Sequence, residues 1–102
     1  MTPAVVTRIT EIERICRRFG VRRLELFGSA ATAAGAGRAR DLDFLVDLGD
    51  APPAAYADAY FGLLEALQSL FHLPVDLVTA PSVTNRYFRK GIARTRRLLY
   101  AA

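Results

Sequence analysis

One stretch decides the fold: Asp41-Leu42-Asp43-Phe44-Leu45-Val46-Asp47-Leu48, in which every second residue is apolar. Successive side chains of a β-strand point to opposite faces of the sheet. The pattern therefore predicts a strand whose even-numbered residues face a core. Its three aspartates lie on the other face, so that face cannot be the buried one.

Two further strands are predicted on either side of this stretch. From Val21 to Phe27, leucines alternate with charged residues, and Gly28-Ser29 ends the run abruptly. After Pro74, the run Val75 to Val78 forms a third, short strand. The three strands are too few to form a core by themselves and need helices packed against them.

Helical patterns fill most of the remaining sequence. Apolar residues recur at spacings of three and four from Thr2-Pro3 to Phe19 and again from Tyr56 to His72. A last helix is predicted from about Thr84 to Tyr100, and the alanines from Ala30 to Ala34 could begin a short one. The resulting order predicts an α/β (α+β) fold: a small three-stranded mixed sheet, about four helices and one open sheet face.

Size and composition restrict the protein class. A chain of 102 residues is expected to form a single domain over 1–102. No apolar run approaches the roughly 20 residues that cross a bilayer, and the N-terminus does not resemble a signal peptide. The only cysteine, Cys16, lies on an apolar helix stripe and is interpreted as core, so cytoplasm is the expected location. The net charge of +4 favours an anionic partner.

Asp41 and Asp43 are candidate metal ligands. Residues two apart in a strand project to the same side, roughly 6 to 7 Å apart. Two carboxylates at that spacing repel each other unless a cation lies between them, and oxygen ligands suit Mg²⁺ or Mn²⁺. The alternative is that both residues belong to the solvent face of an edge strand.

Two other elements complete a candidate site. The Gly28-Ser29 turn would present backbone N–H groups to an anion, and glycine would let a phosphate approach closely. Asp76, between Val75 and Leu77, can point to the same side as Asp41 and Asp43. Three carboxylates beside an anion-binding turn match the requirements of metal-assisted phosphoryl or nucleotidyl transfer.

These three motifs carry a family resemblance. The runs Phe27-Gly28-Ser29, Asp41-Leu42-Asp43 and Val75-Asp76-Leu77-Val78 resemble the signature of the DNA polymerase β-like nucleotidyltransferase superfamily. The length resembles its minimal members, the antitoxin partners of HEPN-domain ribonuclease toxins. The resemblance implies that Gly28 and Ser29 bind the triphosphate, and that Asp41, Asp43 and Asp76 hold the metal and form the catalytic set.

The chain departs from that signature near the turn. Where the family commonly has an arginine, this chain has Thr32, and eleven residues separate Ser29 from Asp41. Arg40 precedes the first aspartate in place of the usual serine or threonine. Arg38 or Arg40 could supply the missing positive charge at the phosphates.

Three functions follow as hypotheses. The first is transfer of AMP from ATP, with Mg²⁺, onto a hydroxyl; the resemblance implies that this acceptor is a tyrosine of a HEPN toxin and that the protein is its antitoxin. The second is an antitoxin that neutralises its partner by contact alone. The third is a nucleic-acid-binding domain that uses a C-terminal basic helix with interleaved aromatic residues. The basic residues of this helix are Arg86, Arg89, Lys90, Arg94, Arg96 and Arg97. The single histidine, His72, is interpreted as a surface or capping residue.

Overall fold

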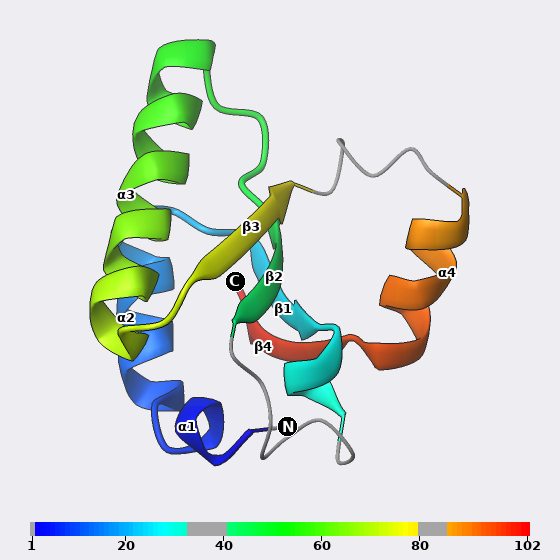
Figure 1. Cartoon of the computed structure of the whole chain (residues 1–102). Helices are drawn as coiled ribbons and strands as arrows, with labels where there is room; N and C mark the ends of the chain where they lie inside the picture. Colours follow the sequence, from blue (N-terminus) through cyan, green and yellow to red (C-terminus); the bar gives the residue numbers. More distant parts are fainter. Residues whose placement is uncertain (1, 33–40, 80–85) are drawn as a thin grey trace.

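A mixed β-sheet organises the protein, shown in Figure 1. The computed structural model describes residues 2–32, 41–79 and 86–102. Within them the sheet has four strands in the order β3-β2-β1-β4; β2 runs parallel to β3, and β1 runs antiparallel to both β2 and β4. The strands are β1 (Arg23–Phe27), β2 (Leu42–Asp47), β3 (Val75–Thr79) and β4 (Arg97–Ala101).

The central strand β2 confirms the predicted alternation. Leu42, Phe44 and Val46 are fully buried, whereas Asp43 and Asp47 are only half-buried on the opposite face. Phe44 also lies against the ring of Phe71, with 6.3 Å between ring centroids. Burial of every second side chain fixes the strand's rotation, because a one-residue slip would expose the apolar side chains.

Two helices cover the apolar face of the sheet. Figure 1 shows α2 (Ile9–Arg18) and α3 (Pro53–Phe71) on one side of the sheet and α4 (Arg86–Thr95) on the other. Because α3 connects the parallel strands β2 and β3, it forms the crossover that such a pair requires. A Cβ at Gly62 would clash with Cε1 of Phe19, so glycine lets the end of α2 pack closely on α3.

The N-terminal helical region is divided in two. A short helix, α1 (Pro3–Val6), precedes α2, and Thr2 caps it by accepting a hydrogen bond from Val5 N–H at 3.4 Å. The helix α2 ends at Arg18, just before Gly20, which has a φ of 67°. Cys16 is confirmed as a core residue: it is fully buried, and burial raises the pKa of its thiol to about 12.

The predicted last helix and the predicted strand count are wrong at the C-terminus. The helix ends at Thr95, and the next residues form β4 along the free edge of β1. Leucine, arginine and lysine favour helix in isolation, but an unpaired β1 edge would leave its backbone groups without partners. Pairing with that edge also buries Leu99 to 7% exposure. In the described residues, the short helix predicted for the alanines from Ala30 onward is a single 3₁₀ turn, η1 (Ser29–Ala31).

Two further observations concern His72 and the length of the helices. His72 is exposed and forms the C-cap of α3 in a left-handed conformation, with φ of 54°, which confirms the capping interpretation. None of the helices in the described ranges is long and apolar enough to span a bilayer.

Candidate active site

Two neighbouring strands place Asp43 and Asp76 beside each other. Asp43 is the register partner of Asp76 in the parallel pair of β2 and β3. Adjacent strands lie about 4.8 Å apart, and register partners project to the same side. Because Leu42 and Phe44 are buried on the helical side, the two carboxylates project from the opposite side of the sheet.

Asp41 adds a third charge at the same end of the sheet. It lies one residue before β2 and is exposed to solvent. The pKa of Asp43 is raised to about 6, first by burial and then by the negative charges of Asp41 and Asp76. The structure thus brings the three aspartates into one electrostatic group, although they come from two separate segments of the chain.

The turn after β1 lies directly against Asp43. The register pairs Phe27 with Asp43, so Gly28 is the next residue beyond that pair. Gly28 has φ of 75° and ψ of −157°, a backbone conformation that is essentially restricted to glycine. A Cβ at Gly28 would lie 2.6 Å from Oδ2 of Asp43. Glycine is therefore required both by the backbone and by the neighbouring carboxylate.

One backbone amide of this turn is already hydrogen-bonded within the protein. The N–H of Gly28 donates a hydrogen bond to Oγ1 of Thr95 at 2.9 Å, so this amide is not available to a phosphate. Ser29 is exposed and begins η1. In the described part of the chain, the amides of Ser29 and Ala30 donate to no protein acceptor. These two amides and the Ser29 hydroxyl are the donors that can meet a phosphate.

The residue that replaces the family's arginine closes the same turn. Thr32 donates a hydrogen bond from its hydroxyl to the carbonyl of Ser29 at 3.1 Å, and its backbone N–H donates to the same carbonyl at 3.3 Å. Thr32 therefore orders the backbone around Ser29 but supplies no positive charge. Arg38 and Arg40, the predicted sources of that charge, lie outside the described residues.

The donor set fits a magnesium or manganese ion. All three side chains offer carboxylate oxygens. The pKa of Asp43 is raised first by burial and then by the charges of Asp41 and Asp76, and a bound divalent cation would offset both effects. Among the residues that the structure describes, no three acidic, histidine or cysteine side chains are placed to hold a metal by themselves. Magnesium commonly binds one or two carboxylates together with substrate phosphates and waters, and this arrangement suits that mode.

Sequence reasoning missed the contact of Thr95 with the site and the burial of Glu25 on β1. Thr95 carries no recognisable motif, and only the fold brings it to Gly28, which is 67 positions earlier. The alternation of leucines with charged residues in β1 predicts Glu25 on the polar face, but this residue is buried at 5% exposure. Both of its carboxylate oxygens are paired, Oε1 with Arg23 at 2.9 Å and Oε2 with Arg96 at 3.3 Å.

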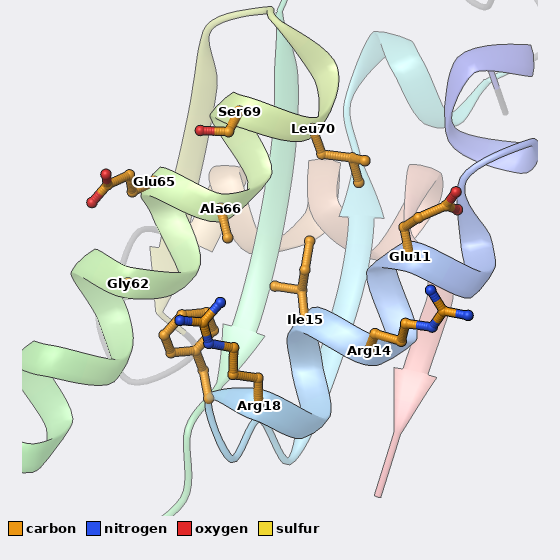
Figure 2. A pocket seen from close by; sticks show the side chains of 10 residues that line it. Glu11, Arg14, Ile15, Arg18, Gly62, Glu65, Ala66, Ser69 and Leu70 are labelled. Carbon is orange, nitrogen blue, oxygen red and sulfur yellow. The ribbon is translucent and has the colours of Figure 1, made fainter.

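A separate groove lies on the helical side of the molecule. Figure 2 shows it between α2 and α3, where Arg14 and Arg18 project from one helix and Glu65 and Ser69 from the other. Ile15 is among the apolar residues that line it. Because the aspartates project from the opposite side of the sheet, this groove is not part of the candidate active site.

Replacing Asp43 with asparagine should stabilise the metal-free protein at neutral pH by about 1 kcal/mol, after allowance for solvent screening of this partly exposed group. Unfolded Asp43 titrates near its ordinary pKa of 3.8, and the folded residue titrates near 6. Between these values the folded state holds more protons, so wild-type stability falls as pH rises. The advantage of Asp43→Asn should be absent below about pH 4 and complete above about pH 6.

Thermal unfolding in the presence of a chelator measures this difference, with the exposed loop residue Asp50 changed to asparagine as a control. Added Mg²⁺ should reduce the difference in stability between Asp43→Asn and wild type, because it should stabilise the wild type alone. An Asp43→Asn variant that is less stable than wild type at pH 7.5 would contradict the conclusion that burial and the neighbouring aspartates make the charge of Asp43 unfavourable.

Comparisons with known proteins agree with the geometry. The family model for the nucleotidyltransferase domain matches residues 9–99. A relative from Methanocaldococcus jannaschii, whose assigned activity of protein adenylyltransferase is itself an inference, is 29% identical over 92 residues. The match covers 82% of this chain and 90% of the relative.

Two solved structures share the fold. One is a tri-AMPylated HEPN toxin of Shewanella oneidensis in complex with its MNT antitoxin, with TM-score 0.63 and 18% identity. The alignment covers 96% of this chain and 73% of that one. The other is a toxin–antitoxin crystal structure with AMP-PNP, with TM-score 0.65, 20% identity, and coverage of 92% of this chain and 73% of the other. Over residues 9–99 the chain matches in sequence as well as in fold, and it therefore belongs to the nucleotidyltransferase domain family, as its three motifs predict.

Proposed function

We propose that this protein is a magnesium-dependent nucleotidyltransferase that moves AMP from ATP onto a tyrosine hydroxyl of a HEPN-type toxin and so acts as its antitoxin. The observation that carries the proposal is the position of the Asp43 carboxylate, against Gly28 and in register with Asp76. Carboxylates and phosphate-binding amides thereby share one end of the sheet. A transferase needs both at the same place, because it must hold the metal and the triphosphate together.

Each group has a defined role in this reaction. The amides of Ser29 and Ala30 and the Ser29 hydroxyl bind the phosphates, and Asp41, Asp43 and Asp76 hold the cation. When bound, the cation neutralises the phosphate oxygens as charge develops. The acceptor oxygen forms a bond to the α-phosphorus, the bond to the β-phosphate oxygen breaks, and pyrophosphate leaves. The exposed carboxylate of Asp76 accepts the hydroxyl proton.

The proposed partner rests on the proteins that share the fold. One of them is crystallised with a HEPN toxin that carries AMP groups, and another contains an ATP analogue. Both structures are toxin–antitoxin complexes. A HEPN-type protein is therefore the acceptor that we propose for this chain.

A contact-only antitoxin is the second candidate. It is favoured by Thr32, whose hydroxyl bonds to the Ser29 carbonyl where the family signature has an arginine. The nucleic-acid hypothesis requires a basic helix that continues to about Tyr100, whereas α4 ends at Thr95. Arg96 pairs with the buried Glu25, and Arg97 belongs to β4. The side chains at positions 86–89 lie outside the described residues.

The proposed transfer predicts which phosphate of ATP is retained. Purified protein, Mg²⁺ and lysate from its own source would be incubated with ATP labelled on either the α- or the γ-phosphate. We expect a labelled protein band with α-label only, because nucleotidyl transfer keeps the α-phosphate and releases the others. Mass spectrometry of that band should find AMP on a tyrosine of a HEPN-domain protein.

Two results would contradict this reaction. A band labelled equally by both forms of ATP would indicate phosphoryl transfer. The absence of any α-labelled band, while a HEPN-domain protein still co-purifies with the chain, would identify the contact-only antitoxin.

A further inference from the structure

We infer that the junction between α4 and β4 is a positioning element of the active site, and that Thr95 is the residue that fixes the Gly28 turn for nucleotide binding. This inference rests on the proposed function for its effect on ATP. Its structural part stands on contacts within the protein. Neither the family signature nor the charge pattern of the sequence points to this residue.

The first contact ties the turn to α4. The Gly28 N–H donates to Oγ1 of Thr95 at 2.9 Å, and this hydrogen bond is partly buried. Gly28 has a glycine-only backbone conformation, and the carboxylate of Asp43 lies on its other side. The turn is thus held between Thr95 and Asp43, and its conformation determines where the next amides, those of Ser29 and Ala30, point.

The second contact ties the following residue to the middle of β1. Nε of Arg96 forms an ion pair with Oε2 of Glu25 at 3.3 Å, and Nε of Arg23 donates a hydrogen bond to Oε1 at 2.9 Å. The Glu25 side chain is only 7% exposed. A buried carboxylate without its partners is strongly unfavourable, so the folded state favours the arrangement in which both arginines pair with Glu25.

The backbone around Thr95 is also fixed from the helix side. The Arg96 N–H donates to the carbonyl of Ile92 at 2.8 Å, and Ile92 is 4% exposed. Thr95 therefore lies between a buried helix residue and an arginine paired with a buried acid. Its hydroxyl is presented to Gly28 at a position set by both α4 and β1, which makes the contact a rigid brace for the turn.

The test compares Thr95→Val, which keeps the shape and removes the acceptor oxygen, with Thr95→Ser, which retains the hydroxyl. Thr7→Val is the matched control, because the Thr7 hydroxyl binds carbonyls of Pro3 and Ala4 in α1. Hydrogen exchange of the Gly28 amide would be measured by NMR without nucleotide, with the Val21 amide, which donates to Cys16 at 2.9 Å, as internal reference. Binding of Mg²⁺-ATP would be measured by calorimetry.

We expect Thr95→Val to speed exchange at Gly28 by about tenfold and to weaken Mg²⁺-ATP binding by about tenfold, which corresponds to the loss of one hydrogen bond. Exchange at Val21 should not change. Thr95→Ser and Thr7→Val should behave as the wild type in both measurements. In transfer assays, Thr95→Val should raise KM for ATP more than it lowers kcat.

Unchanged exchange at Gly28 in Thr95→Val, or equal loss of binding in Thr95→Ser, would overturn the inference. A uniform increase in exchange that includes Val21 would do the same, since it would indicate general destabilisation. The two proposals can fail separately. If the wild type does not bind Mg²⁺-ATP, the proposed function fails, whereas exchange at Gly28 still decides whether Thr95 braces the turn.

Discussion

Replacing Asp41 and Asp43 together by alanine should lower nucleotidyl transfer by about 10³-fold or more while leaving the protein folded. Both residues are proposed metal ligands, and removing them takes away the charge that holds the cation against the phosphates. The raised pKa of Asp43 shows that its charge is unfavourable in the folded state. The double variant should therefore be at least as stable as wild type in a chelator, so that lost activity cannot be attributed to unfolding.

Asp47 provides the matched control on the same strand and the same face of the sheet. Its Oδ1 accepts a hydrogen bond from Gly49 N–H at 2.8 Å, and asparagine retains that acceptor. We expect Asp47→Asn to keep activity within about twofold of wild type, since surface changes away from the site have small effects. The measurement is the amount of α-phosphate label that is transferred from ATP to protein. Substantial transfer by the double variant would remove Asp41 and Asp43 from the mechanism.

Replacing Gly28 with alanine should both destabilise the protein and inactivate it. Adopting the backbone conformation of Gly28 costs a non-glycine residue about 1 to 3 kcal/mol. The new Cβ would also lie 2.6 Å from Oδ2 of Asp43, so the carboxylate or the turn must move. For a domain of this size, we expect the midpoint of thermal unfolding to fall by about 10 °C. Transfer should fall by about 10²-fold or more, because misplacement of reacting groups by about 1 Å has effects of this size.

Gly20 separates backbone strain from damage to the site. Its φ is also positive, at 67°, but no atom lies within 4 Å of a Cβ built there. Gly20→Ala should therefore lower the free energy of unfolding by about 1 kcal/mol and leave transfer by the folded protein unchanged. If Gly28→Ala kept wild-type activity, the close contact between the turn and Asp43 would have no catalytic importance.

The local pattern of the sequence was enough to determine the central part of the fold. Alternation from Leu42 to Leu48 set the strand, its buried face and the side from which the aspartates project. Glycine at position 28 marked the end of β1 and the turn beside Asp43. These features depend on a side chain's own face and on short-range backbone conformation, which a linear pattern records directly.

Contacts between distant segments were decided only by the tertiary structure. Residues Arg97–Ala101 favour a helix by themselves, but they pair with the open edge of β1 and form β4. The same pairing brings Thr95 to Gly28 and Arg96 to Glu25. Intrinsic helix preferences amount to less than about 1 kcal/mol per residue. Hydrogen bonding along a strand edge and burial of Leu99 outweigh them, and neither is encoded in the local sequence pattern.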